Sequence, residues 1–333
     1  MLRLHEFRYH RPGSLDEAAA LLREHQGDVM PIAGGTDLMP NMKHRLFTPG
    51  HVVSLTGAPE LRGIAVRDGE LVIGAGETLS TVAADARVRR HAPSLARAAG
   101  LVAGPQLRNM GTIGGNICLD TRCTYYNQTF FWRQALGFCL KKDGDTCHVT
   151  KVGRKCVAAH SADSPPVLMT LNASVDLVSA DGERTVSVED MFVSDGIWNT
   201  VRRPDEILAR VRIPRSSAGL RTGFEKLRQR NAIDFPLLNV AIAAHIDAGE
   251  EIGSMKVVVS ALGSRPRAIS GLDHIAVGHR LDDDVIDAVA ERAHQQCHPL
   301  TNITVDPDWR RAMVPVHVRR ALHGLVRAEP LAA

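Results

Sequence analysis

The amino-acid sequence predicts an α+β protein, and three observations support this fold class. Through the first two thirds of the chain, short stretches with the alternating pattern of β-strands follow stretches with the spacing of amphipathic helices. Two alternating stretches meet at Asp181-Gly182, a dipeptide that favours a tight hairpin turn. In the last third, strand-like stretches come first and helical stretches follow, which is the order expected of an α+β unit.

The first half of the chain begins with a clear helix signal. Ser14 suits the N-cap position, and Glu17, three residues later, completes a capping box. A short strand predicted at 28–33 runs into a glycine pair, after which Thr36 and Asp37 suit the start of a second helix. Further strands are predicted at 51–55 and 70–76, and two helices separated by Pro93 are predicted at 78–103.

The second half contains the hairpin and a C-terminal unit. The segment 165–192 is predicted to form two strands about the Asp181-Gly182 turn. Proline, serine and glycine between 214 and 223 interrupt the pattern, which places the last domain boundary there. Strands are predicted at 235–247 and 252–264, and helices at 283–297 and 309–326. The predicted domains are 1–55, 56–215 and 220–333.

Composition and charge exclude several classes of protein. The chain has 333 residues, of which 44% are hydrophobic and 23% charged; this is enough for two or three cores of roughly 100–200 residues each. A net charge of +3 does not indicate a nucleic-acid or membrane surface. Because the N-terminus is charged and no stretch reaches the ~20 apolar residues of a membrane span, we expect a cytoplasmic protein. In that compartment, clustered cysteines favour metal binding or catalysis over disulfides.

Two glycine-rich turns are candidates for binding an anionic ligand. The first, PIAGGTDL at 31–38, lies between a predicted strand and a predicted helix, where unpaired amides can hold a phosphate. The second is NMGTIGGNI at 109–117. Each alone is equally well explained as a tight turn. Neither matches G-x-G-x-x-G with an acidic residue ~20 positions later, which disfavours a Rossmann nicotinamide site.

The order of four segments gives a family resemblance. PIAGGTDL, GTIGGN, SADSPPVLM and FEKLRQRNAIDFPLLNVAIA begin at Pro31, Gly111, Ser161 and Phe224. Over nearly its whole length the chain resembles the flavoprotein subunits of the xanthine oxidase and carbon monoxide dehydrogenase family. This resemblance implies two small α+β subdomains that enclose FAD, assigned to 1–55 and 56–215, and a C-terminal α+β domain.

The resemblance also implies FAD contacts in this chain. In the family, the two glycine-rich loops wrap the diphosphate and ribityl parts of FAD. Asp163 matches an acidic residue near the flavin, Lys226 matches a lysine near its ring, and Val102 and Tyr125 are further candidates. The loop residues that match are Ile32, Ala33, Gly34, Gly35, Thr36, Asp37 and Leu38 in the first loop and Thr112, Ile113, Gly114, Gly115 and Asn116 in the second.

A cysteine-rich segment of about forty residues, 117–160, follows the second glycine loop. Four of its cysteines are candidate metal ligands, with fifteen, seven and eight residues between them: Cys123, Cys139, Cys147 and Cys156. The spacing lacks the C-x-x-C pairs of common zinc sites, so zinc is the less favoured alternative. A 4Fe-4S cluster needs four thiolates, and its net negative charge is costly to bury without compensation.

Charged and aromatic residues of the same segment suit a buried cluster. Seven basic residues outnumber the acidic ones, among them Asp143 and Asp145: Arg122, Arg133, Lys141, Lys142, Lys151, Arg154 and Lys155. Six of the fourteen aromatic residues lie here and could restrict the access of water. Cys118 and Cys297 remain outside the ligand set, and Cys118 is expected to be a small buried residue. The fifteen histidines show no metal-binding spacing, so none is assigned to a metal.

The cysteine-rich segment resembles that of the β subunits of 4-hydroxybenzoyl-CoA reductases, in DTRCTYYNQ, GFCLK, GDTCHV and RKCVAAHSAD. This resemblance implies FAD and a 4Fe-4S cluster in the chain, a ferredoxin-like electron donor, and transfer to 2Fe-2S and molybdenum-cofactor subunits in an αβγ dimer of trimers. Reductive dehydroxylation to benzoyl-CoA would occur in the molybdenum subunit, so no catalytic residue is expected here. Candidate docking residues for ferredoxin are Lys141, Lys142, Lys151, Arg154 and Lys155.

Two alternative functions stay open. One is a flavin and iron–sulfur subunit of a molybdenum hydroxylase such as an aldehyde or xanthine dehydrogenase, because some aldehyde oxidoreductases also have a cluster segment, with different cysteine spacing. The other is a zinc-stabilised binding module without a redox role, which would rest on the four cysteines alone.

Overall fold

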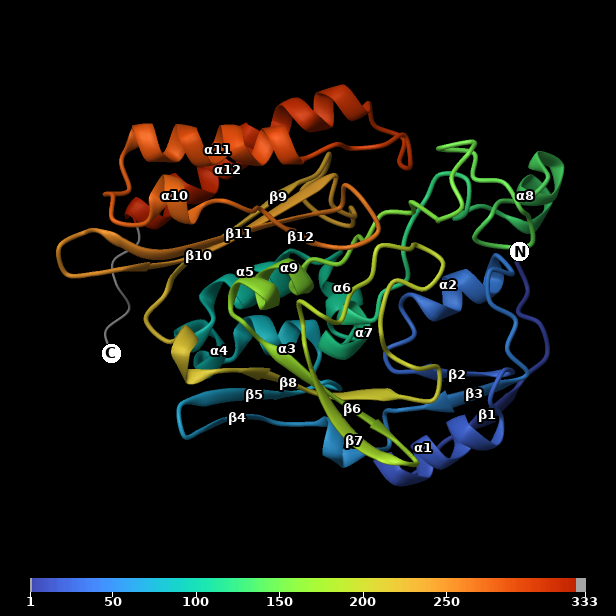
Figure 1. Ribbon diagram of the computed structural model, residues 1–333. Helices are drawn as coiled ribbons and strands as arrows, with labels where there is room; N and C mark the ends of the chain where they lie inside the picture. Colours follow the sequence, from blue (N-terminus) through green and yellow to red (C-terminus); the bar gives the residue numbers. More distant parts are fainter. Residues whose placement is uncertain (1, 328–333) are drawn as a thin grey trace.

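The computed structural model describes residues 2–327 and confirms the predicted α+β class. In this range the strands form sheets of three, five and four strands, in chain order (Figure 1). Helices fill the space between the five-stranded and four-stranded sheets, and further helices cover the outer face of the four-stranded sheet (Figure 1). The strands of each sheet come from one of the three predicted domains.

The N-terminal sheet is parallel, with the order β1-β3-β2. Its strands are β1 (Arg8–His10), β2 (Val29–Ile32) and β3 (His51–Ser54), and α1 (Leu15–Glu24) connects the first two. Half of the predicted capping box is confirmed: Ser14 Oγ accepts a hydrogen bond from the Glu17 amide (3.2 Å). The Glu17 carboxylate accepts its hydrogen bond from the Gly13 amide (2.8 Å), one residue before the N-cap. After the first glycine loop, the chain enters α2 (Leu38–Lys43).

The middle sheet is antiparallel, with the order β4-β5-β8-β6-β7. Residue pairing between β6 and β7 confirms the hairpin at Asp181-Gly182. Its strands are β4 (Ile64–Arg67), β5 (Glu70–Gly74), β6 (Ser174–Ser179), β7 (Gly182–Ser187) and β8 (Ile207–Ile213). The prediction of a strand from 165 is wrong at its start: 164–170 form a helix, α9 (Ser164–Thr170), because prolines are well tolerated in a first helical turn.

The helices of the middle region lie against this sheet. The segment 78–103 forms three helices where two were predicted: α3 (Leu79–Ala84), α4 (Ala86–His91) and α5 (Pro93–Leu101). The additional break is at Asp85, whose side chain caps α4 by accepting hydrogen bonds from the amides of Arg87 and Val88. Short helices follow at α6 (Pro105–Arg108) and α7 (Ile113–Ile117), and 3₁₀ turns lie at Pro59–Leu61 and Arg215–Ser217.

The C-terminal sheet is antiparallel, with the order β12-β11-β10-β9. Its strands are β9 (Arg221–Leu227), β10 (Leu238–Ile246), β11 (Ile252–Ser260) and β12 (Arg267–Ala268). The predicted C-terminal helices are confirmed as α11 (Asp283–Gln296) and α12 (Pro307–Arg327), with a short α10 (Asp273–Ala276) before them. Most of β10 is buried, because α12 packs on one side of it and α9 on the other.

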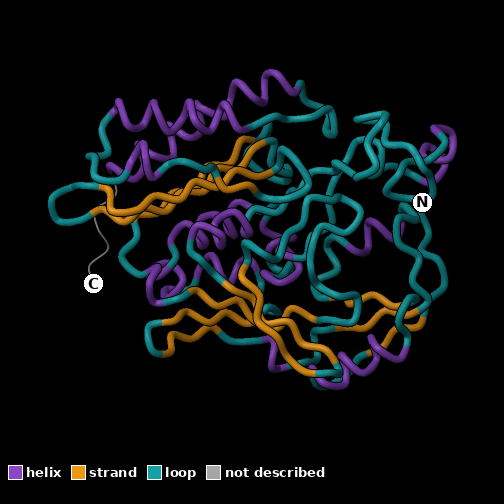
Figure 2. The backbone as a smooth tube through the Cα atoms, viewed as in Figure 1, coloured by secondary structure: helices purple, strands orange, loops and turns teal. Residues whose placement is uncertain are grey.

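The cysteine-rich segment is mostly irregular, with one short helix, α8 (Phe130–Leu136) (Figure 2). Arg133 of α8 is only 1% exposed and fastens the segment to the end of α2. Its guanidinium donates hydrogen bonds to the carbonyl oxygens of His44 (3.4 Å) and Arg45 (3.0 Å). A buried guanidinium needs such acceptors, so this contact fixes the segment on the N-terminal region.

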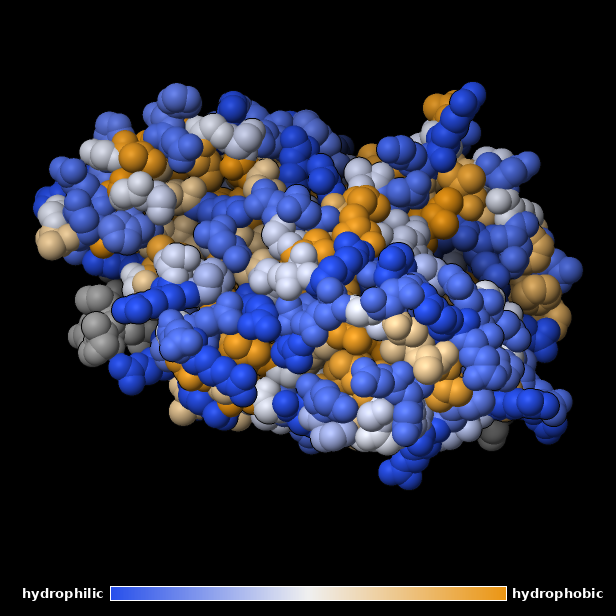
Figure 3. Space-filling model, turned by 60° about the horizontal axis from the view of Figure 1, so that its bottom comes forward, coloured by the Kyte–Doolittle hydropathy of each residue, from blue (hydrophilic) through white to orange (hydrophobic). Residues whose placement is uncertain are grey.

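Within residues 2–327, no helix is both long and apolar enough to cross a membrane. On the face shown in Figure 3, hydrophobic residues form separate patches among hydrophilic ones. The cytoplasmic location stays a prediction.

Candidate cofactor sites

A cavity of about 440 Å³ lies among the loop after β2, the second glycine loop and the start of the C-terminal sheet. The structure brings most of the predicted FAD-contact residues into its wall: Ile32, Ala33, Gly34, Gly35, Thr36, Asp37, Leu38, Val102, Thr112, Gly114, Gly115, Asn116, Asp163 and Lys226. Two predicted residues lie elsewhere. Ile113 is buried in the core of the middle region, and Tyr125 lines a second cavity.

The loop after β2 offers unpaired backbone amides to the large cavity. In the described part of the chain, the amides of Gly34, Gly35 and Thr36 donate hydrogen bonds to no protein acceptor. Gly35 has a φ of +70°, which glycine adopts without strain. Gly34 lies against the second glycine loop so closely that a Cβ would stand 1.8 Å from the carbonyl oxygen of Met110. Successive free amides around a left-handed residue form a concave site for an anion.

In contrast to the first loop, the second glycine loop has amides that donate hydrogen bonds within the protein. The Gly114 amide donates to the carbonyl of Ala75 (2.9 Å), and the Gly115 amide donates to Thr112 Oγ1 (3.1 Å), which caps α7. A Cβ on Gly114 would lie 2.7 Å from that of Ala75. These contacts hold the loop in place, so its contribution to the cavity is mainly its shape.

A buried ion pair forms another part of the wall. Lys226 Nζ lies 2.6 Å from Asp163 Oδ2 and donates a second hydrogen bond to the carbonyl of Leu101 (3.1 Å). Asn239 Nδ2 donates to Asp163 Oδ1 (2.9 Å). Burial raises the pKa of Asp163, and the attraction of Lys226 with the hydrogen bond of Asn239 opposes that rise. The hydrogen bonds hold both side chains in fixed positions at the cavity wall.

Arg122 and Phe235 also line the large cavity, and sequence analysis did not assign them to it. The guanidinium of Arg122 forms an ion pair with Asp37 and lies 4.5 Å from the centroid of the Phe235 ring, a cation–π contact. Burial lowers the pKa of Arg122 to about 10. No local sequence pattern connects residues so far apart, whereas the structure places this positive charge in the same cavity wall as the free amides.

A second, small cavity is lined by all four predicted ligand cysteines. Cys139, Cys147 and Cys156 are each 7% exposed, and Cys123 is partly buried. Burial raises the pKa of Cys123 to about 11, and the charges of the other three thiols add to that rise. The structure therefore brings together four thiols that the sequence separates by up to thirty-three positions.

The distances between these four sulfurs determine which kind of metal site they can form. No three of the four Sγ atoms, all within the described residues, lie within 4.8 Å of one another. Tetrahedral Zn–S bonds of about 2.3 Å place two sulfurs about 3.8 Å apart. In this structure the four sulfurs therefore do not form the compact arrangement of a single tetrahedral zinc site.

The side chain of Lys141 is only 4% exposed and lines the cysteine cavity, so the prediction of Lys141 as a docking residue is wrong. Its Nζ donates to Asp120 Oδ1 (2.6 Å) and to the carbonyl of Gly196 (2.8 Å), and lies 4.5 Å from the centroid of the Tyr126 ring. Its side chain is therefore committed to contacts within the protein. Lys151, Arg154 and Lys155 are exposed, as expected of docking residues, and Lys142 is partly exposed.

The two cavities share a wall at consecutive residues. Arg122 lines the large cavity, and Cys123 lines the cysteine cavity. Arg122 and Ala159 exchange both of their backbone hydrogen bonds, at 2.8 and 2.6 Å, which joins the two ends of the cysteine-rich segment. A group bound by the cysteines would therefore lie next to a ligand of the large cavity.

The other two cysteines lie outside the quartet. Cys118 lines the large cavity and is only partly buried, so its prediction as a buried residue holds in part. Burial raises its pKa, while the Arg202 guanidinium opposes that rise. Cys297 is 3% exposed in the C-terminal core.

Comparison with known families identifies the family of both parts of the chain. Residues 5–216 match the family described as the FAD binding domain in molybdopterin dehydrogenase, and 223–325 match the CO dehydrogenase flavoprotein C-terminal domain. The chain belongs to the molybdopterin dehydrogenase FAD-binding family. It is therefore an FAD-binding oxidoreductase subunit. This membership does not agree with a binding module that lacks a redox role.

Relatives in this family cover 80% or more of the chain. The carbon monoxide dehydrogenase medium chain of Hydrogenophaga pseudoflava is 27% identical over 320 residues, covering 95% of this chain and 96% of that one. The aldehyde oxidoreductase FAD-binding subunit PaoB of Escherichia coli is 31% identical over 277 residues, covering 80% and 85%. The structure of the Hydrogenophaga carbon monoxide dehydrogenase matches with a TM-score of 0.81 at 26% identity, over 97% of this chain and 98% of the other.

Proposed function

We propose that this chain is an electron-transfer subunit of a molybdenum-containing oxidoreductase and relays electrons between FAD and a 4Fe-4S cluster. The observation that supports the relay best is the shared wall between the cavities, where Arg122 and Cys123 are consecutive. FAD supplies the redox chemistry when bound, and the protein supplies position and electrostatics. Consecutive wall residues keep the two groups close, as direct electron transfer requires.

FAD is assigned to the large cavity. The amides of Gly34, Gly35 and Thr36 have no protein acceptor within residues 2–327 and are offered to the diphosphate. Arg122 adds positive charge to the wall of the same cavity. Lys226 and Asp163, held rigid by their ion pair, are assigned to the flavin end.

The cluster is assigned to Cys123, Cys139, Cys147 and Cys156. Among the described residues, no three of their sulfurs lie within 4.8 Å of one another, and this favours a four-iron group over a single zinc ion. Their burial limits access of water, and Lys141, which lines the same cavity, offsets negative charge on the thiolates. These residues bind and shield the group and place it beside the FAD cavity.

The finer function proposed is that of a 4-hydroxybenzoyl-CoA reductase β subunit, with a ferredoxin-like donor and with 2Fe-2S and molybdenum-cofactor partners. The support is the resemblance of the cysteine-rich segment, together with exposed Lys151, Arg154 and Lys155, whose charge suits an acidic donor. A second candidate is the corresponding subunit of an aldehyde-oxidising enzyme, favoured by the 31% identity to the aldehyde oxidoreductase subunit.

Anaerobic purification of the complex tests the proposal. We expect one FAD and about four irons per copy of this chain, besides the iron of the partners, by Cys₄ cluster stoichiometry. Zinc in place of this iron would contradict the cluster assignment. Reduction of the complex by ferredoxin supports the reductase, whereas reduction by an aldehyde, with no response to ferredoxin, would favour the second candidate.

A further inference from the structure

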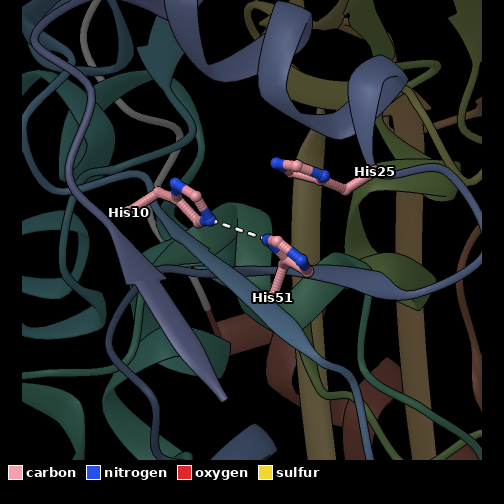
Figure 4. A group of neighbouring side chains, drawn as sticks. All are labelled: His10, His25 and His51. Carbon is pink, nitrogen blue, oxygen red and sulfur yellow. Dashed lines mark hydrogen bonds between the residues drawn. The ribbon is translucent and has the colours of Figure 1, made fainter.

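Three histidines from separate segments converge beside the N-terminal sheet (Figure 4). His10 ends β1, His51 begins β3, and His25 is the C-cap residue of α1. One ring nitrogen from each lies within 4.8 Å of those of the other two. His10 Nε2 and His51 Nδ1 form a hydrogen bond of 2.9 Å, which a bound ion would replace, and the rings of His25 and His51 stack with centroids 3.7 Å apart (Figure 4).

The parallel register explains why these side chains meet. Arg8 pairs with His51, and His10 pairs with Val53, two residues beyond His51. Because side chains alternate along a strand, His10 and His51 lie on the same face of the sheet. The helix α1 contacts β2 and β3, and its C-terminal end brings His25 to the other two (Figure 4).

The chemistry of the cluster suits a transition-metal ion. Neutral imidazole is the commonest metal ligand among side chains, and three histidines with an open position form a known kind of zinc site. All three side chains are partly exposed, so an ion has access from solvent. Three imidazolium rings this close would repel one another, which favours neutral rings.

We propose that His10, His25 and His51 bind a divalent ion of the zinc class, with water at the remaining positions. The site is separate from both cofactor cavities. Sequence analysis assigned no histidine to a metal, because the three stand fifteen and twenty-six positions apart and only folding brings them together.

Such an ion would cross-link β1, the end of α1 and β3. The strand β2 pairs with β3 and continues directly into the loop with the free amides. The bound ion is therefore expected to stabilise the subdomain that supports the FAD loop, without contact to FAD itself.

Zinc binding to the purified protein with its cofactors bound tests the site. Equilibrium dialysis against Zn²⁺ should give one more ion per wild-type chain than per His10→Ala, His25→Ala or His51→Ala chain, with affinity at this site lower by about tenfold or more. His274→Ala, an exposed histidine on α10, is the matched control and should bind as wild type does. His25→Ala is the deciding variant, since it lies outside every sheet and leaves strand pairing untouched.

Two further measurements distinguish metal binding by the three histidines from metal binding by the cysteines. Co²⁺ bound by imidazoles and water should show weak visible bands without the intense charge-transfer absorption of thiolate ligands. Zn²⁺ should raise the melting temperature of wild type and of Cys147→Ser, but not that of His25→Ala. Equal zinc uptake and an equal thermal shift in His25→Ala, His274→Ala and wild type would overturn the proposal.

Discussion

The large cavity and the cysteine cavity are adjacent but are built from different parts of the chain. The large cavity presents free backbone amides and close glycine packing, supported by β2, α7 and β9. The cysteine cavity depends on four side chains in a segment with little regular structure (Figure 2). A backbone-built site tolerates many side-chain changes but not an added Cβ, whereas a side-chain site fails when one ligand is changed. The predictions below test this difference.

The largest effect is expected from a change of one cysteine ligand. Cys147→Ser replaces a soft thiolate with a harder oxygen, so this chain should lose most of its iron. FAD should remain, because its proposed contacts lie mainly outside the cysteine-rich segment. Iron and flavin analysis of the same sample measures both. The control is Cys297→Ser, a buried cysteine in the C-terminal core, which should keep its iron. Equal iron content in Cys147→Ser and Cys297→Ser would contradict the assignment of Cys147 as a cluster ligand.

The next effect concerns the buried pair of the large cavity. Lys226→Met leaves Asp163 buried without its partner, which should lower the free energy of unfolding by about 3–5 kcal/mol. Urea denaturation measures this loss. Lys256→Met is the matched control, because Lys256 pairs with Glu189 near the surface and should contribute only about 0–1 kcal/mol. Similar losses of unfolding free energy in the two variants would show that the ion pair of Lys226 with Asp163 stabilises the protein no more than a surface pair does.

A smaller effect is expected from an added methyl group in the first glycine loop. In Gly34→Ala, the Cβ meets the Met110 carbonyl, so the two loops must move apart, at a cost of about 1–3 kcal/mol in FAD binding. Flavin titration of the apoprotein gives the affinity. Gly324→Ala, in α12 with open space around it, should bind FAD like wild type. Unchanged affinity in Gly34→Ala would contradict a backbone-built site.

The smallest effect is expected at the wall between the cavities. Arg122→Met removes the partner of Asp37, which is partly exposed, so FAD binding should weaken by only about 1 kcal/mol. Iron content should not change, because Cys123 keeps its backbone position through the neighbouring strand bridge. Loss of iron equal to that of Cys147→Ser would show that Arg122 supports the cluster more than FAD.

Local signals in the sequence predicted much of the fold. The N-cap at Ser14 and the Asp181-Gly182 hairpin each depend on neighbouring residues, and both are confirmed. Errors arose where one residue type supports two structures. The prolines of α9 were taken for part of a strand, although proline is also stable in a first helical turn.

The candidate sites were less predictable, because they join distant segments. The candidate FAD-contact residues and the cysteine quartet came from motifs and resemblance, and the structure gathers nearly all of them into two cavities. The contact of Arg122 with Phe235 and the cluster of His10, His25 and His51 left no local pattern. Lys141 shows a further limit of sequence analysis. Its positive charge follows from the sequence, but the burial of its side chain does not.

An anaerobic reductive titration of this chain, purified with its cofactors, tests the central claim of two adjacent redox groups most directly. FAD takes up two electrons and a 4Fe-4S cluster one, so the chain should accept about three electrons, and Cys147→Ser about two. The difference should be matched by the loss of iron absorption in the variant. A wild-type chain replete with FAD that accepts only two electrons, equal to Cys147→Ser, would contradict the account.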